Sequence, residues 1–282
     1  MIITTLVENT KSSDRSDLIP EEGLSLYVRL GDRSILFDTG VKDAIGHNAA
    51  RLGVDLPSVN LAVISHHHFD HGGGLPLFLK ENSSAPVYLK GRRNEEYYLR
   101  LLGIFKKYVG LDDRLFVEHA DRFAFVDEFT EISPGVFIIT EIEKSYPQPK
   151  GNRLLFSKQG KSWRLDPFEH ELIFVIQEED GLVVITGCSH RGILNMIQTV
   201  TKKFPGIPVK ATIGGFHQIL LPVFDTMAAS RSEVEELGES LLQYPIEKIY
   251  TGHCTGQKAY RILKQVMGDR LHSLHTGSVI EI

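Results

Sequence analysis

The segment Ser65-His66-His67-His68-Phe69-Asp70-His71-Gly72-Gly73-Gly74 contains the pattern H-x-H-x-D-H. Side chains two residues apart in extended backbone point the same way, so His66 and His68 are placed to bind one metal ion. A turn after them directs Asp70 and His71 towards a neighbouring ion, and the glycines permit that turn and a close backbone approach. Imidazole and carboxylate suit zinc, iron or manganese. The segment therefore predicts a metal site, with a polar surface turn as the alternative.

The residues before this cluster support the prediction. Leu61–Ser65 is a short apolar run, which is typical of a buried strand. The ligands would then stand at a strand end, on a rigid base. His67 faces away from His66 and His68 in such a backbone, so we expect it to have a structural role or to orient a ligand.

Composition narrows the class of protein. The chain has 282 residues, of which 42% are apolar and 24% charged, as in ordinary globular enzymes. A net charge of -5 without a long basic run argues against nucleic acid as a partner. The start, MIITTLVENT, lacks the pattern of a signal peptide, and no stretch reaches 18 uncharged apolar residues. We therefore expect a cytoplasmic protein without a membrane partner.

Alternation of strands and helices predicts sheets with helices packed on them. Strands are expected at Ile2–Val7, Leu24–Leu30, Ser34–Phe37, Leu61–Ser65, Leu172–Gln177, Leu182–Thr186, Val209–Ile213 and Ile246–Tyr250. Helices are expected at Val41–Leu52, Leu75–Lys80, Gly192–Phe204, Ser230–Tyr244 and Gly256–Met267. The fourth helix begins with Ser230 and Glu233 three residues later, which fits a capping box.

The stretch 94–109 has two interpretations. Tyr98, Leu101, Leu102 and Phe105 have helical spacing, and basic residues surround them: Arg92, Arg93, Arg100, Lys106 and Lys107. The positive charges indicate either a solvated helix face or a lid that recognises phosphate near the metals.

Four blocks in order resemble the metallo-β-lactamase superfamily: Leu36–Gly40 (LFDTG), His66–His71, Thr186–Cys188 (TGC) and Gly252–Cys254 (GHC). The resemblance implies an α+β fold, a four-layer αβ/βα sandwich with a dinuclear metal site between two sheets. It also implies one domain over 1–282, with a helical or β insertion around 91–165. ITGCSHRGI, IGGFH and TGHCTG resemble a subgroup that includes dihydropterin–ribofuranosylaminobenzene phosphate synthase and generic metal-dependent hydrolases.

The resemblance also implies roles for single residues. His66 and His68 would bind the first metal, and Asp70, His71 and His253 the second. The third ligand of the first metal is either His190 or His170, and the subgroup resemblance favours His190.

Three residues keep two interpretations each. Cys188 stands where most of the superfamily has a bridging aspartate, so it is a thiolate ligand or a small buried residue, and the number of metals stays open. His217 donates a proton or contacts substrate, or is a packed loop residue. Asp38 orients a ligand or is a simple turn residue.

We expect a hydrolase that uses a metal-bound hydroxide on a phosphoester, ester or lactone. Asp70 would orient the hydroxide, and His217 or His190 would protonate the leaving group. The cofactors would be two divalent ions, zinc before manganese or iron. The substrate would be a small molecule, phosphorylated compounds included, and the oligomeric state is undetermined. The alternatives are a synthase or transferase on a phosphorylated pterin-type substrate, an iron-dependent redox enzyme and a non-catalytic metal protein.

Overall fold

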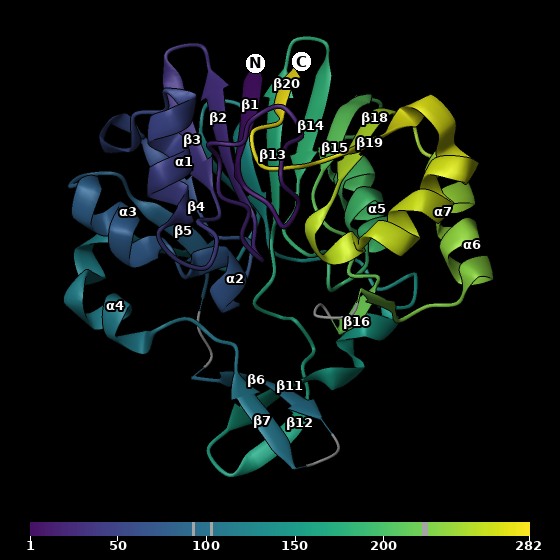
Figure 1. Ribbon diagram of the computed structural model, residues 1–282, viewed down its shortest axis with the longest axis horizontal. Helices are drawn as coiled ribbons and strands as arrows, with labels where there is room; N and C mark the ends of the chain where they lie inside the picture. Colours follow the sequence, from purple (N-terminus) through teal and green to yellow (C-terminus); the bar gives the residue numbers. More distant parts are fainter. Residues whose placement is uncertain (92–93, 102–103, 222–224) are drawn as a thin grey trace. The chain divides into compact units, whose positions relative to one another are not determined.

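Each of the two units into which the chain divides is built on a seven-stranded sheet (Figure 1). The computed structural model describes residues 1–91, 94–101, 104–221 and 225–282. Unit 1 comprises Met1–Arg93, Tyr108–Val126 and Leu274–Ile282, and unit 2 comprises Asn94–Lys107 and Asp127–Ser273. No helix in the described ranges has the length and apolar character needed to cross a membrane.

The sheet of unit 1 is mixed, with the strand order β20-β1-β2-β3-β4-β5-β8. Its strands are β1 (Ile2–Val7), β2 (Ser25–Leu30), β3 (Arg33–Phe37), β4 (Leu61–Val63), β5 (Val87–Lys90), β8 (Phe123–Val126) and β20 (Val279–Glu281). The pairs from β3 to β8 are parallel and the others antiparallel. The helices are α1 (Ala44–Leu52), α2 (Phe69–Gly72), α3 (Leu75–Glu81) and α4 (Asp113–Glu118).

One apolar cluster holds the helices of unit 1 on their sheet. Ile45 of α1 and Phe78 of α3 are fully buried against strand residues such as Leu36 and Val87. Burial of one such side chain stabilises the fold by about 1.5–3 kcal/mol. The loops that follow β3 and β4 are thereby fixed to a rigid base, as the sequence predicts for the histidine cluster.

Unit 2 repeats this plan, with the strand order β19-β18-β15-β14-β13-β10-β9. Its strands are β9 (Thr130–Ser133), β10 (Val136–Ile139), β13 (Ile173–Glu178), β14 (Gly181–Ile185), β15 (Val209–Ile213), β18 (Ile246–Thr251) and β19 (Leu271–Ser273). Its helices, α5 (Ile193–Lys203), α6 (Arg231–Leu242) and α7 (Gln257–Met267), share one apolar cluster with this sheet. The capping box at Ser230 and Glu233 is confirmed. A short pair, β16 (Ile219–Leu221) and β17 (Thr226–Met227), completes the unit.

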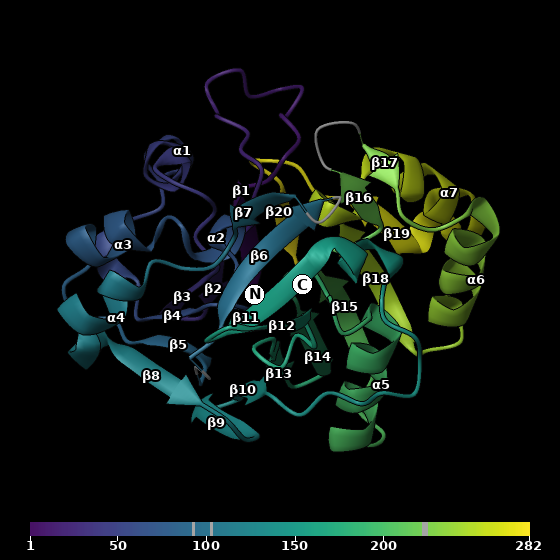
Figure 2. The same ribbon diagram turned by 90° about the horizontal axis from the view of Figure 1, so that it is seen from below.

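A third, four-stranded sheet lies in unit 2 apart from Tyr108, with the order β12-β11-β6-β7 (Figures 1 and 2). Its strands are β6 (Glu96–Leu101), β7 (Phe105–Tyr108), β11 (Leu155–Gln159) and β12 (Ser162–Leu165). The helix predicted over 94–109 is therefore wrong. Pairing of β6 with the distant β11 overrides the local helical spacing, because a strand's preference is set by its cross-strand neighbours. Leu102, Arg92 and Arg93 of that prediction lie outside the described residues.

Candidate metal centre

The predicted ligands of unit 1 gather at the end of β4 and in the short helix α2. His66 Nε2 lies 3.1 Å from His68 Nδ1. The ring centroids of His66 and His71 are 4.2 Å apart. All three rings are buried. The Asp70 carboxylate is 3.6 Å from His71 Nε2. His67 faces the other way and bonds the Lys90 carbonyl through Nε2, as its place in the alternation predicts.

Asp38 fixes the orientation of these rings. It follows β3, is fully buried and accepts hydrogen bonds from the backbone N–H and the hydroxyl of Ser65, both at 2.7 Å. Its other contact is with His71 Nδ1 at 2.6 Å. A carboxylate at Nδ1 favours the tautomer that carries its proton there, which leaves Nε2 with a lone pair for a metal. The interpretation of Asp38 as an orienting residue agrees with this geometry.

The glycines that follow the histidines allow the loops after β3 and β4 to touch. A Cβ on Gly73 would lie 2.2 Å from the Val41 carbonyl oxygen, and one on Gly74 would lie 2.2 Å from that of Thr39. In the same place, the backbone N–H of Thr39 donates to the His71 carbonyl at 2.6 Å. The expected close backbone approach is confirmed, and only glycine fits these two positions.

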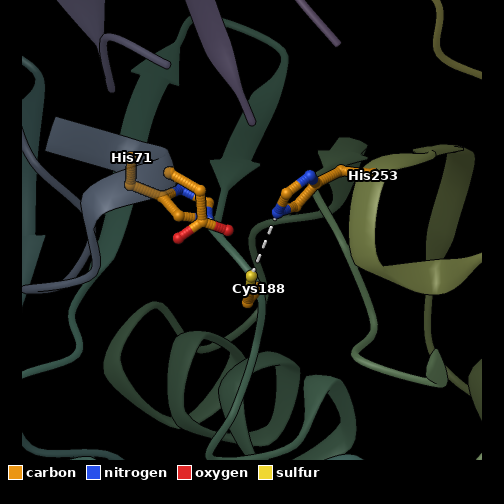
Figure 3. Close-up of side chains that lie close together, drawn as sticks. His71, Cys188 and His253 are labelled. Carbon is orange, nitrogen blue, oxygen red and sulfur yellow. Dashed lines mark hydrogen bonds and ion pairs between the residues drawn. The ribbon is translucent and has the colours of Figure 1, made fainter. Parts of the chain in front are cut away.

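In unit 2, Cys188 and His253 come together from the ends of two parallel strands. Cys188 follows β14 and His253 follows β18, and Cys188 Sγ lies 3.3 Å from His253 Nε2 (Figure 3). Both side chains are buried, and both cysteines are free thiols. A thiol and an imidazole nitrogen at this distance suit a cation such as zinc, which binds both types of ligand.

His190 lies in the loop between β14 and α5 and is held on three sides. Its Nδ1 is 3.0 Å from Asn152 Oδ1, and its ring stacks on Phe168 with centroids 4.2 Å apart. Glu171 accepts hydrogen bonds from the backbone N–H groups of His190 and Arg191 at 2.8 and 2.7 Å. Burial raises the pKa of Glu171 to about 8, although the two N–H donors oppose that shift. This loop is therefore fixed before any metal binds.

His217 extends the donor set of unit 2. One ligand atom each from Cys188, His190 and His217 lies within 4.8 Å of the other two. Neither ring nitrogen of His217 makes a hydrogen bond within the described part of the chain. Burial raises the pKa of the neighbouring Cys254 thiol, but Cys188 and the rings of His253 and His217 outweigh it and hold that pKa well below its ordinary value.

The alternative ligand, His170, has other partners. Its Nε2 lies 3.1 Å from Asp166 Oδ2, and its ring packs against Tyr97 with centroids 4.1 Å apart. It is also buried. Both candidates for the third ligand thus have fixed positions, but their neighbours differ: a carboxylate next to His170 Nε2, and an amide oxygen next to His190 Nδ1.

Sequence reasoning missed Glu171 and Asn152. Glu171 lies two residues before β13, and a carboxylate at the edge of a buried strand is a signal for a specific partner. Asn152 lies in the short 3-10 helix Lys150–Leu154. Both act on His190 across 19 and 38 residues, a separation that local spacing does not reveal.

Both donor sets fit divalent metal ions. Unit 1 offers three imidazoles and a carboxylate, and unit 2 offers a thiol and the imidazoles of His190, His217 and His253. These mixed nitrogen, oxygen and sulfur donors suit zinc. Carboxylate or amide partners orient at least one ring in each set, as is usual around bound metals.

Comparisons with known proteins agree with this chemistry. The model of the metallo-beta-lactamase superfamily matches residues 18–253. The chain is 30% identical over 277 residues to 7,8-dihydropterin-6-methyl-4-(beta-D-ribofuranosyl)-aminobenzene-5'-phosphate synthase of Methanocaldococcus jannaschii, covering 93% of this chain and 90% of that protein. The crystal structure of Tm1679, described as a metal-dependent hydrolase of the beta-lactamase superfamily, is 30% identical with a TM-score of 0.82, covering 100% of this chain and 99% of that one. The predicted fold class, α+β and metallo-β-lactamase-like, is thereby confirmed.

Proposed function

The chain belongs to the metallo-β-lactamase superfamily, and on that premise we propose that it is a hydrolase that uses two divalent cations to cleave a small phosphoester, ester or lactone. Members of this superfamily are generally metal-dependent hydrolases. The observation that carries the proposal is the pair of buried donor sets with prepositioned rings, one in each unit. Zinc is the proposed metal because the donors include a thiol and several imidazoles.

The proposed centre combines the two donor sets. His66, His68 and His190 bind one cation, and a second group binds the other: Asp70, His71, Cys188 and His253. Each unit alone supplies only part of each group, so the assignment requires the loops after β4, β14 and β18 to meet. Three protein ligands would hold the first cation, which is the number typical of catalytic rather than structural zinc sites.

The chain's own residues have distinct tasks in this mechanism. When bound, the cations would supply an activated water and stabilise the negative charge that develops on the substrate oxygen. Asp70 is partly exposed, with 23% of its side chain accessible, so its second oxygen can accept a hydrogen bond from the attacking water. His217 has a ring nitrogen without a hydrogen bond in the described protein, and it donates a proton to the leaving group.

The ligand role of Cys188 is tested with cobalt in place of zinc. We expect wild-type protein to show absorption from thiolate–cobalt charge transfer and Cys188→Ser to lose it. Cys254→Ser is the matched control, because Cys254 is also buried and its Sγ lies 3.5 Å from the Cys188 carbonyl oxygen, but it is not among the proposed ligands. Loss of the absorption in Cys254→Ser but not in Cys188→Ser would show that Cys254, and not Cys188, is the thiolate ligand.

The reaction is tested with a panel of substrates on zinc-loaded protein. Phosphodiesters, cyclic phosphates, esters and lactones are compared with pterin and ribosyl phosphate compounds. Turnover that is lost in both His66→Ala and His190→Ala supports a hydrolase with ligands from both units. A protein that binds two zinc ions but cleaves none of these bonds would contradict the proposal.

A second candidate is a synthase or transferase on a phosphorylated pterin-type substrate. It is favoured by one observation, the 30% identity over nearly the whole chain to the synthase named above. The same metals would serve, but a group of the second substrate would replace water as the nucleophile. Product formation from two substrates, without hydrolysis of either alone, would select this reaction.

A further inference from the structure

We propose that one face of the four-stranded sheet β12-β11-β6-β7 binds a small planar aromatic anion. The proposal concerns binding alone, and it holds whether or not the metal centre is hydrolytic. The face contains Tyr98 and Arg100 of β6, Phe156 of β11, Trp163 of β12 and Lys106 of β7, and we call it the aromatic face.

Strand register places these side chains together. Alternation along β6 turns Tyr98 and Arg100 to the same side. Phe156 is the direct cross-strand partner of Tyr98, and Lys158 is that of Trp163. Because Phe156 and Lys158 are two residues apart on β11, both pairs lie on the same side of the sheet. The rings of Tyr98 and Trp163 have centroids 5.0 Å apart.

Cations lie over these rings. The Arg100 guanidinium carbon is 4.5 Å from the Trp163 centroid and 4.8 Å from that of Phe156, and Lys106 Nζ is 5.0 Å from Trp163. Such contacts hold a cation near an aromatic surface without neutralising its charge.

The charges on the aromatic face are unbalanced. Lys158 Nζ forms an ion pair with Glu96 Oε2 at 2.5 Å. The same carboxylate also accepts a hydrogen bond from the Tyr98 hydroxyl. Arg100 and Lys106, in contrast, form no ion pair within the described ranges, and Arg100 Nε is buried without a hydrogen-bond acceptor there. A buried donor that lacks an acceptor costs free energy, and an anionic oxygen would satisfy it.

These observations define the ligand. Two cations and an N–H donor that have no partner among the described residues call for an anionic group, and the surrounding rings call for a planar apolar body. Two charges are too few to track a nucleic acid backbone, and the chain carries a net charge of -5. A small aromatic phosphate, phosphonate or carboxylate therefore fits best.

The opposite face of this sheet links it to the donor set of unit 2. Tyr97, between Glu96 and Tyr98, is buried and packs on His170. The segment Lys150–Leu154, immediately before β11, carries Asn152, which bonds His190. A ligand on the aromatic face would thus be held by strands that are anchored next to a proposed metal ligand.

Trp163 makes the test direct, because it is the only tryptophan in the chain. Its fluorescence is followed in metal-loaded, full-length protein during titration with phenylphosphonate, which has no bond for a hydrolase to cleave, and calorimetry measures the same binding independently. Benzyl alcohol and inorganic phosphate are the neutral and the non-aromatic comparisons, and each should bind at least about tenfold more weakly.

Two variants and a control locate the site. We expect Arg100→Gln to weaken phenylphosphonate binding about tenfold and Lys106→Gln about threefold. Arg164→Gln should change it less than twofold, because Arg164 lies on the other side of β12 and bonds Ser157 and Glu95.

Three outcomes would overturn the proposal. They are the absence of saturable binding, an equal loss in Arg164→Gln, and tighter binding of a ten-nucleotide thymidine oligomer than of phenylphosphonate. Titration of His66→Ala separates this proposal from the proposed function. Binding that persists there supports the aromatic face even if no hydrolysis is found, and binding that is lost there assigns the anion to the metal centre instead.

Discussion

Replacing Asp38 by asparagine should weaken metal binding without emptying the space that the side chain fills. Asp38 accepts three hydrogen bonds, from the Ser65 N–H, the Ser65 hydroxyl and the His71 ring. The amide oxygen of asparagine can keep the bond from the Ser65 N–H, which places its NH2 group opposite His71 Nδ1. A donor there favours the tautomer with the proton on Nε2, the nitrogen that lies 3.6 Å from Asp70.

The size of the effect follows from this change of tautomer. A metal can bind His71 Nε2 only after that proton has left, so the variant must restore the original tautomer against its new neighbour. Partners that orient metal ligands contribute about 10–100-fold to affinity, or roughly 1.4–2.8 kcal/mol. Loss of one hydrogen bond to a buried carboxylate should also lower the free energy of unfolding by about 1.5–3 kcal/mol.

Zinc affinity is measured by competition with a chromophoric chelator, and stability is measured by urea unfolding of the metal-free protein. Asp166→Asn is the matched control, because Asp166 is also a buried carboxylate beside a histidine, His170, and accepts from the Phe168 N–H. It should lose stability but keep zinc affinity within about twofold. Unchanged zinc affinity in Asp38→Asn would refute the orienting role, and an equal loss in Asp166→Asn would make His170 the better third ligand.

Other perturbations test the fold and its electrostatics. Gly73→Ala should lower the free energy of unfolding by about 2–3 kcal/mol in urea titrations, because the new Cβ would lie 2.2 and 2.4 Å from backbone oxygens. Gly31 has open space around it and a φ of 61°, so Gly31→Ala should lower the free energy of unfolding by only about 1 kcal/mol. Arg122→Met should cost about 3 kcal/mol in the same assay, since Arg122 donates four hydrogen bonds to Asn82 and Ala85. Lys150 is the main cause that lowers the pKa of Glu233 from 4.5 to about 2, so Glu233 stabilises the folded protein above pH 4.5 and loses that effect as the pH falls through 2. The difference in melting temperature between wild type and Glu233→Gln should therefore be present at pH 7 and vanish near pH 2, and a gap that stays constant would contradict this assignment.

The sequence predicted the features that depend on neighbours along the chain. The H-x-H-x-D-H segment places its side chains by strand alternation followed by a turn, and both are local properties. For the same reason, eight of the fourteen strands of the two large sheets were predicted to within a few residues, as were five helices: α1, α3, α5, α6 and α7.

The failures arise where distant segments decide the outcome. The stretch 94–109 has helical spacing but becomes strands, because β11, more than 50 residues later, supplies the pairing partner. The contact of Glu171 with the His190 backbone is likewise invisible to spacing. His170 and His190 both lie in loops that join buried elements, so only their partners in the structure distinguish them.

Backbone strain separates these metal-centre loops from ordinary strand ends. Among the described residues other than glycine, seven have positive φ, and five of these lie in or next to one of the two donor sets: Asp38 in unit 1, and Phe168, Ser189, His217 and His253 in unit 2. A left-handed conformation costs about 1–2 kcal/mol at each such position, and residues of this kind persist only where packing enforces them. The apolar clusters beneath the two sheets supply that packing, since they fix the strands from which these loops emerge. The rigid strand ends therefore hold these loops in strained backbone conformations that an unrestrained loop would not keep. For this reason the donor side chains are in place before a metal binds.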